Sequence, residues 1–314
     1  MDPLPGTGSS PQPNQHQWAG HEAALERVFA VPGVVFLVGG MDTGKTTFGI
    51  DLAARAVAAG IPTAIVDADI GQSTVGPPTT VGLKLCSGMG NVARESIRDA
   101  DGLGFVGALT PAGHMLPLVT GTAKLVARAM AADCKLVIID TTGSVSGVAG
   151  QLQKFSKMDL APPDIVIAFS RGGELEPILG HTRRFTTAEV IELEVPEAVD
   201  TRSVEERTTY RERQFAAYFQ AGLSRWRIKP QVFMPSLPPE FDLALLDGIV
   251  VGMEDGKGSC VGIGVLENGG ARDTLKMVSP VTEGVKGLRL GSIRISTNGR
   301  SRGPVNLRNL FQTE

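Results

Sequence analysis

Continuous apolar runs alternate with amphipathic segments over the first two thirds of the chain. The apolar runs predict buried strands at residues 34–38, 63–66, 105–107, 135–140, 163–169 and 190–195. Apolar residues at helical spacing predict helices at 21–29, 47–59, 116–132 and 151–160, and a short polar helix within 87–101. Strands and helices that alternate in this way usually form a mostly parallel sheet with helices on both faces. The pattern therefore predicts an α/β domain.

The pattern changes after residue 228. Short alternating runs at 248–253, 260–266 and 288–295 are separated by Gly, Asp and Asn residues, which is typical of a small β-rich domain. The first 20 residues are rich in Pro, Gln, Ser and Gly, a composition that favours disorder. We therefore predict a disordered tail at 1–20, an α/β domain at 21–228 and a β-rich domain at 229–314.

Composition limits the classes of function. Hydrophobic residues make up 42% of the 314 residues and charged residues 20%, so the chain can bury a large core. Cys86, Cys134 and Cys260 lie far apart and match no metal-binding spacing, which predicts reduced thiols and a cytoplasmic protein. No secretory signal opens the sequence and no apolar run is long enough to span a bilayer, so we expect no membrane partner.

The charge distribution allows nucleic-acid binding only through local patches. The net charge is −3, so the chain as a whole does not attract polyanions. The most basic segment, residues 284–308, has no acidic residue and carries Lys286, Arg289, Arg294, Arg300, Arg302 and Arg308. This segment either lines a groove for a phosphodiester backbone or is a solubilising tail.

A glycine-rich turn follows the first predicted strand. Residues 39–46 match G-x-x-x-x-G-K-S/T, and a helix is predicted directly after them. Such a loop wraps backbone N–H groups around a polyphosphate at a helix N-terminus, with its Lys on the β/γ-phosphates and its Thr on Mg²⁺. The alternative is a turn that is merely tight. The predicted ATP-binding residues are Gly39, Gly40, Asp42, Thr43, Gly44, Lys45, Thr46 and Thr47.

Acidic residues stand at the ends of two predicted strands, where open α/β sheets place their ligands. Asp140 ends the strand at 135–140 and, with Thr46, is the predicted Mg²⁺ ligand. Asp67 and Asp69 end the strand that follows the glycine-rich turn (the P-loop) and its helix. We predict that Asp69, at the very end of that strand, carries chemistry and that Asp67 is structural. A turn-capping role for both remains an alternative.

A helix rich in arginine is predicted at residues 201–220. Arg207 and Arg211 are spaced i, i+4 and therefore share one helical face, and Arg202 lies at the start of the helix. One interpretation is a solvated face on which these arginines pair with Glu205, Glu206 and Glu212. The other is a lid, at residues 200–221, that carries arginines to a transferring phosphoryl group.

Together these motifs resemble the polynucleotide 5′-hydroxyl kinases, the family of the RNA kinase of the pre-mRNA cleavage and tRNA-splicing machinery and of the ribosomal-RNA-processing kinase. The resemblance runs from about residue 31 to residue 221 and is greatest to the short archaeal and bacterial members. It is carried by GGMDTGKTT at 39–47, DADIGQS at 67–73, FVGALTPAGH at 105–114, DTTGSVSG at 140–147 and the arginine-rich segment TRSVEERTTYRERQFAAYF. The combination of DADIGQ with the arginine helix is the most specific part.

The resemblance implies a role for each matching residue. Lys45 and Thr46 would handle the ATP phosphates and Mg²⁺, and Asp69 would be the base that activates a 5′-hydroxyl. Arg202 and Arg207 would be the lid arginines, supported by Arg211, and Gln72 would lie close to metal or substrate. Eukaryotic members carry an aromatic residue that stacks on a substrate base at the position of Ser144. How this chain grips the base is therefore open.

The sequence thus predicts a P-loop phosphotransferase that uses ATP and Mg²⁺ to phosphorylate the 5′-hydroxyl end of RNA or DNA. Two alternatives remain at this stage. One is a regulatory or chaperone-type P-loop NTPase, which hydrolyses nucleotide without an acceptor. The other is a non-catalytic ATP-binding subunit of a nucleic-acid-processing complex. The oligomeric state, the strandedness of the substrate and the pathway are not indicated.

Overall fold

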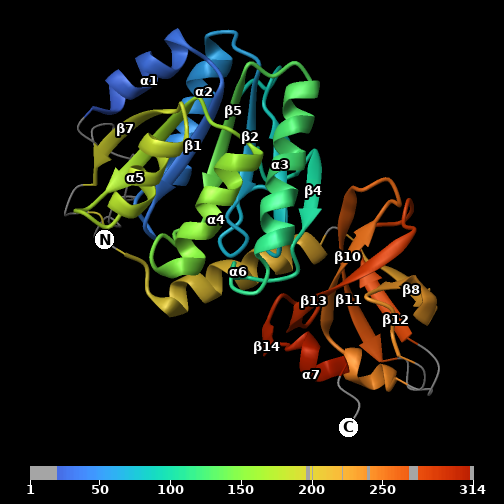
Figure 1. Cartoon of the computed structure of the whole chain (residues 1–314). Coiled ribbons are helices and arrows are strands. Elements are labelled where there is room, and N and C mark those ends of the chain that lie inside the picture. The colour runs from blue at the N-terminus through green and yellow to red at the C-terminus, as the bar shows by residue number, and fades with distance from the viewer. Residues whose placement is uncertain are drawn as a thin grey trace, which may run out of the picture.

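The computed structural model describes residues 20–195, 199, 201–220, 222–238, 241–268 and 275–311. The predicted disordered tail, apart from Gly20, lies outside these residues. Figure 1 shows an α/β body and a smaller β-rich body, with helix α6 (Val204–Phe219) leading from one to the other. Among the described helices, each is too short or too polar to pass through a bilayer.

Five parallel strands form the centre of the α/β body. They run in the order β2-β5-β1-β6-β7. Their bounds are β1 Val34–Gly39, β2 Thr63–Ala68, β5 Leu136–Thr141, β6 Ile165–Ser170 and β7 Glu189–Glu194. Every residue of β1, β2 and β5 is buried, which explains why their sequences are continuous apolar runs rather than alternating ones.

Helices cover both faces of this sheet (Figure 1). Their bounds are α1 His21–Ala30, α2 Lys45–Ala58, α3 Met115–Ala131, α4 Gly147–Leu160 and α5 Glu176–Phe185. The apolar stripes of α3, α4 and α5 pack in one core on one face, and those of α1 and α2 pack in a second core on the other. The predicted fold class, a P-loop-type α/β sheet with helices on both faces, is confirmed.

Two antiparallel strands extend the sheet at the β2 edge. These are β3 (Thr80–Leu85) and β4 (Gly102–Phe105). The sequence analysis missed β3 and placed a strand at 105–107, and the structure assigns no helix within 87–101. Gly82 interrupts the apolar run of β3 because a Cβ there would lie 2.1 Å from the carbonyl oxygen of Val75. The close crossing of these two segments hides the strand signal.

The β-rich body is mostly antiparallel and has its own apolar core. Its strands are β8 Ser224–Ile228, β9 Phe233–Met234, β10 Ile249–Glu254, β11 Cys260–Asn268, β12 Leu275–Ser279, β13 Gly287–Ile295 and β14 Ser301–Pro304. Two 3₁₀ turns, Pro230–Val232 and Leu243–Leu246, and helix α7 (Leu307–Phe311) complete it. One backbone pair, Cys260 with Leu103, joins β11 to β4 and links the two bodies into one sheet.

The strand pairing bears on the domain boundary that the sequence suggested after residue 228. β8 pairs with β12 throughout its length, so it belongs with the β-rich strands. We propose that the division lies before β8, near residue 222, and that the lid helix α6 precedes it. The last turns of α6 nevertheless pack on the β-rich body, where Phe215 and Phe219 share a core with Val250 and Ile263.

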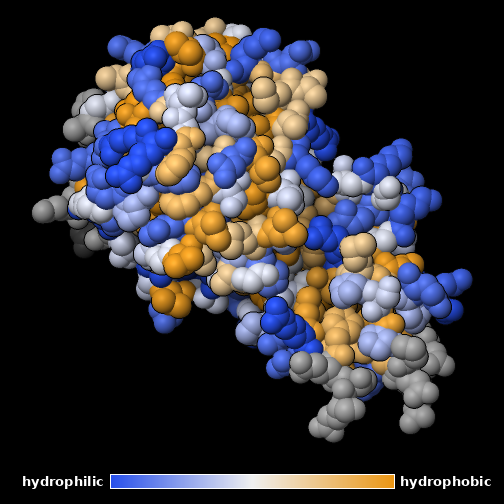
Figure 2. All heavy atoms as spheres, viewed as in Figure 1, coloured by the Kyte–Doolittle hydropathy of each residue, from blue (hydrophilic) through white to orange (hydrophobic). Residues whose placement is uncertain are grey.

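Apolar side chains on the outer surface are scattered. Val148, Leu152 and Phe185 are exposed on α4 and α5. Figure 2 shows such apolar residues interrupted by polar ones across this face. Single exposed apolar residues of this kind are normal in a folded protein and need no partner.

The packing of α6 generates a stability prediction. Phe215 is 2% exposed in the shared core. Phe215→Ala should lower the free energy of unfolding by about 3–5 kcal/mol, because it opens a cavity between α6 and the β-rich body. Urea unfolding measures this. Phe185→Ala is the matched control, since Phe185 is 72% exposed and its loss should change stability by less than about 0.5 kcal/mol. Equal losses in both variants would contradict the packing argument.

Candidate active site

The P-loop joins β1 to α2 and turns back on itself. A Cβ on Gly39 would lie 2.8 Å from the carbonyl oxygen of Phe169, so only glycine fits there. Lys45 begins α2 and folds over the loop, where its Nζ donates to the carbonyl of Gly40 at 2.5 Å and to Thr43 Oγ1 at 3.3 Å. The first N–H groups of α2 have no partner within the helix, as at any helix N-terminus, and favour an anion at this end of the loop.

Lys45 is a buried cation among acids. Its side chain is 6% exposed, and burial lowers the pKa of its ammonium group below the usual value. Asp140, Asp69 and Asp42 oppose this effect and raise the pKa, so all three carboxylates lie within electrostatic reach of Lys45. The sequence placed these four residues in three separate motifs, with Asp42 and Lys45 sharing the P-loop, and the fold brings them to one point.

Thr46 and Asp140 form a pair suited to Mg²⁺. Thr46 Oγ1 donates to Asp140 Oδ2 at 2.5 Å, and Thr46 lies beside the helix N-terminus that would hold phosphates. Burial raises the pKa of Asp140, and Lys45 and the Thr46 hydroxyl lower it in part. A hydroxyl and a carboxylate next to a phosphate site are the oxygen ligands that Mg²⁺ takes in P-loop proteins, so these residues fit the ion.

Asp67 and Asp69 have different surroundings. The carboxylate of Asp67 is buried and accepts the backbone N–H groups of Asp69, Thr74 and Val75 at 2.9, 2.6 and 3.0 Å. Burial, with repulsion from Asp140, raises the pKa of Asp67 to about 7. These contacts shape the 67–75 loop, as a structural aspartate would.

Asp69 lies in the cavity instead. Its Oδ1 accepts the N–H groups of Gly71 and Gln72 at 3.2 and 3.1 Å, and its side chain lines the space in front of the P-loop. A carboxylate that is oriented by backbone groups and open to a ligand can accept a proton. Asp69 therefore lies where a ligand can reach it, and its role as the base stays a prediction.

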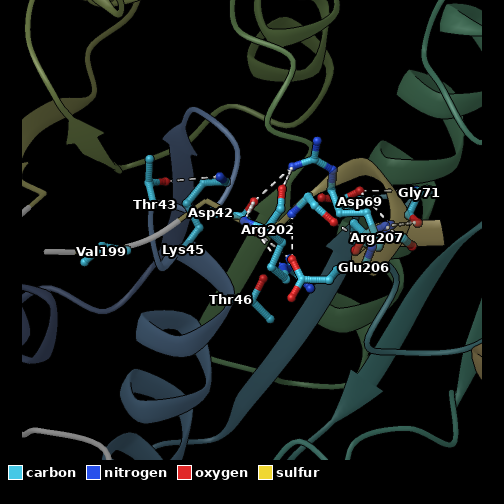
Figure 3. A network of polar contacts seen from close by, with 12 residues as sticks. Asp42, Thr43, Lys45, Thr46, Asp69, Gly71, Val199, Arg202, Glu206 and Arg207 are labelled. Atoms are coloured by element: carbon cyan, nitrogen blue, oxygen red, sulfur yellow. Dashed lines mark hydrogen bonds and ion pairs between the residues drawn. The ribbon is translucent and has the colours of Figure 1, made fainter. Parts of the chain in front are cut away.

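The lid helix α6 begins with a capping box. Ser203 Oγ accepts the N–H of Glu206, and the Glu206 carboxylate accepts the N–H of Ser203. The cap places Arg202 just before the helix and Arg207 in its first turns. Both side chains contact the carboxylate of Asp42 in the P-loop, at 2.7 and 3.2 Å (Figure 3).

These contacts show which partners the arginine side chains have, while the lid itself stays a prediction. Arg202 and Arg207 pair with the P-loop, Glu206 caps the helix, and Glu212 accepts the N–H of Ser301. The arginines therefore point into the site and not onto a solvated face with those two glutamates. Arg211 donates to Thr208 Oγ1 at 2.8 Å and also lines the cavity.

The lid is also tied to the loop that carries Asp69. Gln72 Nε2 donates to the carbonyl of Arg207 at 3.2 Å, and Tyr210 and Gln214 each donate to the carbonyl of Ser73 at 3.1 Å. The sequence analysis missed Tyr210 and Gln214. Their spacing of three and seven residues after Arg207 places them near the same helical face, which is the signal that could have found them.

One cavity of about 810 Å³ collects the predicted residues. Its lining includes Lys45, Thr46, Asp69, Gln72, Arg202, Arg207 and Arg211, together with Ser144. Asp140 lies beneath it, reached through Thr46. Arg94, Thr110 and Tyr210 also line the cavity and were not named as site residues. Thr110 lies in the family-like segment 105–114 and Tyr210 near the helical face of Arg207, so only Arg94 had no signal in its local sequence.

The family follows from comparison with known proteins. The mRNA cleavage and polyadenylation factor CLP1 P-loop family matches residues 39–221, more than half of the chain. The chain belongs to the CLP1 P-loop family. The resemblance found in the sequence is thereby confirmed, and the matched segment includes both the P-loop and the lid.

Relatives and solved structures agree with the CLP1 family assignment. Proteins named polyribonucleotide 5′-hydroxyl-kinase are similar over most of their length. One from Pyrococcus abyssi is 26% identical and the alignment covers 89% of this chain and 93% of the relative. One from Thermococcus kodakarensis is 28% identical, with 87% and 91% covered. A wild-type Clp1p–Pcf11p complex has the same fold, with a TM-score of 0.66 at 12% identity over 87% of this chain and 77% of that one.

Three polar residues of α4 support the CLP1-type site from below, and the sequence analysis missed all three. Lys154 Nζ donates to Thr141 Oγ1 at 2.7 Å and to the carbonyl of Thr142 at 2.6 Å. Gln153 donates to Thr142 Oγ1 and to the carbonyl of Ser144. Together with Lys157, they occupy the buried face of α4. The sequence signal that could have found them is the presence of lysines at positions of an amphipathic helix that face the core.

The basic segment at 284–308 gives little support to a phosphodiester groove. Arg289 pairs with Glu254, Arg302 pairs with Asp247, and Arg294 donates to the carbonyls of Asp247 and Leu245. These three arginines fasten strands and turns of the β-rich body to one another. They are part of the β-rich body and not a solubilising tail.

The buried Lys157 generates a pH prediction. Its Nζ has no hydrogen-bond partner within the described part of the chain, and burial lowers its pKa from 10.5 to about 7 although Asp69 and Asp140 oppose the shift. A lowered folded-state pKa contributes stability that is complete above pH 10.5 and is lost as the pH falls towards 7. Between pH 7 and 10.5 this lysine should make the free energy of unfolding of the wild type rise by about 1.4 kcal/mol per pH unit. Lys157→Met should lack this rise.

Urea unfolding of both proteins at pH 7.5, 8.5 and 9.5 measures this slope. Lys135→Met is the control, because Lys135 is exposed and its replacement should leave the pH profile parallel to that of wild type. A Lys157→Met profile that is also parallel would show that the lysine does not titrate in this range.

Proposed function

We propose that this chain is an ATP-dependent polynucleotide 5′-hydroxyl kinase that transfers the γ-phosphate of ATP to the 5′-OH end of RNA. The observation that carries the proposal is the single cavity into which the P-loop, Asp69 and the lid arginines all project. A simple NTPase needs no proton acceptor positioned for a second substrate. The names of the relatives from Pyrococcus abyssi and Thermococcus kodakarensis favour RNA as the acceptor.

The transfer step uses groups on three elements. Asp69 accepts the proton of the 5′-hydroxyl as its oxygen attacks the γ-phosphorus. The new 5′-O–P bond forms in line with the bond to the β–γ bridging oxygen, which breaks and leaves on ADP. Lys45, Arg202 and Arg207 stabilise the negative charge on the transferring group. Thr46 and Asp140 would hold Mg²⁺, which neutralises phosphate charge when bound.

The lid contacts favour transfer to the acceptor over transfer to water. Gln72, Tyr210 and Gln214 join α6 to the 67–75 loop, so the lid and the predicted base close on a ligand as one unit. A closed lid excludes bulk water, which would otherwise compete with the 5′-hydroxyl. The proposal includes a cytoplasmic location, which the free thiols of Cys86, Cys134 and Cys260 favour. It also includes a contact to the substrate base that uses no stacked aromatic side chain at position 144, because that residue is Ser144.

Kinase assays on two variants test the proposal. Label from [γ-³²P]ATP should appear on a 5′-OH oligoribonucleotide with wild type. Asp69→Asn should lower the transfer rate by about 10²–10⁴-fold, because no group accepts the proton, while ATP binding is retained. Arg207→Ala should lower it by about 10³-fold or more.

The matched control is Arg183→Ala, which removes an arginine that pairs with Glu176 and Glu192 on the surface of α5 and β7. It should leave transfer unchanged. Wild-type protein that hydrolyses ATP at the same rate with and without RNA, and never labels RNA or DNA, would refute the kinase assignment.

A further inference from the structure

Asp42 is the P-loop residue with the densest set of contacts to the lid. Its Oδ1 accepts Nε and Nη2 of Arg202, both at 2.7 Å. Its Oδ2 accepts the backbone N–H of Arg202 at 3.1 Å and Nη1 of Arg207 at 3.2 Å. The Asp42 side chain is only 7% exposed. Figure 3 shows its contacts with the lid arginines. One carboxylate thus holds both arginines that the proposed transfer needs.

The backbone around Asp42 holds this carboxylate in place. Asp42 has φ of 53°, a left-handed conformation that Gly, Asn and Asp adopt most readily. Its carbonyl accepts Nη2 of Arg171 at 3.0 Å, and the same nitrogen donates to the carbonyl of Val199, just before the lid. Glycine would satisfy the turn at least as well. The side chain of Asp42 is therefore not explained by the turn alone.

The charges in this cluster do not balance. Two guanidinium groups share one carboxylate, so a net positive charge remains beside the phosphate-binding loop. A γ-phosphate group carries more negative charge than a carboxylate and has three acceptor oxygens, so it is the better partner for both arginines. The β-phosphate of ADP is held by the N–H groups of the loop and does not supply this additional anion.

We propose that Asp42 is a specificity-determining residue that stands in for the γ-phosphate in the nucleotide-free protein. It holds Arg202 and Arg207 over the P-loop, and only a nucleoside triphosphate exchanges with it. Because ATP must displace Asp42 from the arginines and ADP does not, the contact reduces the preference of the protein for ATP over ADP. It also keeps the lid ordered before nucleotide binds. This inference rests on the proposed kinase function, because it assigns the lid arginines to the γ-phosphate.

Binding measurements with Asp42→Asn test the exchange. The variant keeps the side-chain shape and the left-handed backbone but removes the charge that competes with the γ-phosphate. The ratio of the dissociation constant for ADP to that for a non-hydrolysable ATP analogue, both with Mg²⁺ and without RNA, should rise about five- to tenfold. An unchanged or lower ratio would overturn the proposal. Measurable ADP binding by the variant shows that its P-loop is intact.

Two controls separate exchange from a general effect of charge. In the Arg202→Ala/Arg207→Ala background, adding Asp42→Asn should change the ratio by less than about twofold, because no arginine remains to be released. Asp51→Asn removes the same charge from α2, where Asp51 pairs with Arg55, and should leave the ratio at the wild-type value. A rise that persists without the arginines would overturn the proposal.

Hydrogen exchange gives a reading on the wild type itself. Without nucleotide, the amides of Glu206 and Arg207, which donate to Ser203, should already be protected, ADP should leave them unchanged, and Asp42→Asn should speed their exchange. Free exchange of these two amides in the nucleotide-free wild type would contradict a held lid. Wild-type protein that binds no ATP and labels no RNA would instead remove the proposed function, a result distinct from either outcome for Asp42.

Discussion

The carboxyl edge of the parallel sheet holds many charged groups, most of them buried. Lys45, Asp42, Asp67, Asp69 and Asp140 meet there, and Lys154 and Lys157 lie beneath them. Buried charges are stable only when each is offset by a partner or by hydrogen bonds. This constraint accounts for three features: the turn of the P-loop, the contacts of the lid and the polar residues on the buried face of α4. Each of them supplies partners for buried charges.

The constraint also explains why the site is assembled from distant segments. A parallel sheet brings the ends of β1, β2 and β5 to one edge, so groups that lie far apart in the chain converge without any long loop. Charges are then compensated between segments, by a hydrogen bond from Thr46 to Asp140 and by the ion pairs of Asp42 with Arg202 and Arg207. A phosphate ligand enters a network in which partners already exist and replaces some of them.

The sequence predicted the parallel core well, because fully buried strands and amphipathic helices leave clear patterns. It also placed the P-loop, Asp140 and the arginine helix, since each has a motif with a physical reason behind it. It failed where tertiary contact decides. β3 is interrupted by a glycine that a neighbouring loop requires, and β8 was separated from its partner strand by the assumed domain boundary. The pairing of Asp42 with Arg202 joins residues 160 positions apart, and no local pattern indicates it.

The contact between α6 and the β-rich body affects what counts as the functional unit. The family match ends at residue 221, yet Phe215 and Phe219 are buried by residues of β10, β11 and β13. Gly299, in the turn between β13 and β14, also lies close to α6. A Cβ there would be 2.3 Å from the carbonyl oxygen of Glu212. The helix that carries Arg207 and Arg211 is thus packed on a β-rich body that lies outside the segment matched by the family. Substitutions in that body that move α6 would also move these arginines, so they would affect the site without any change in the P-loop.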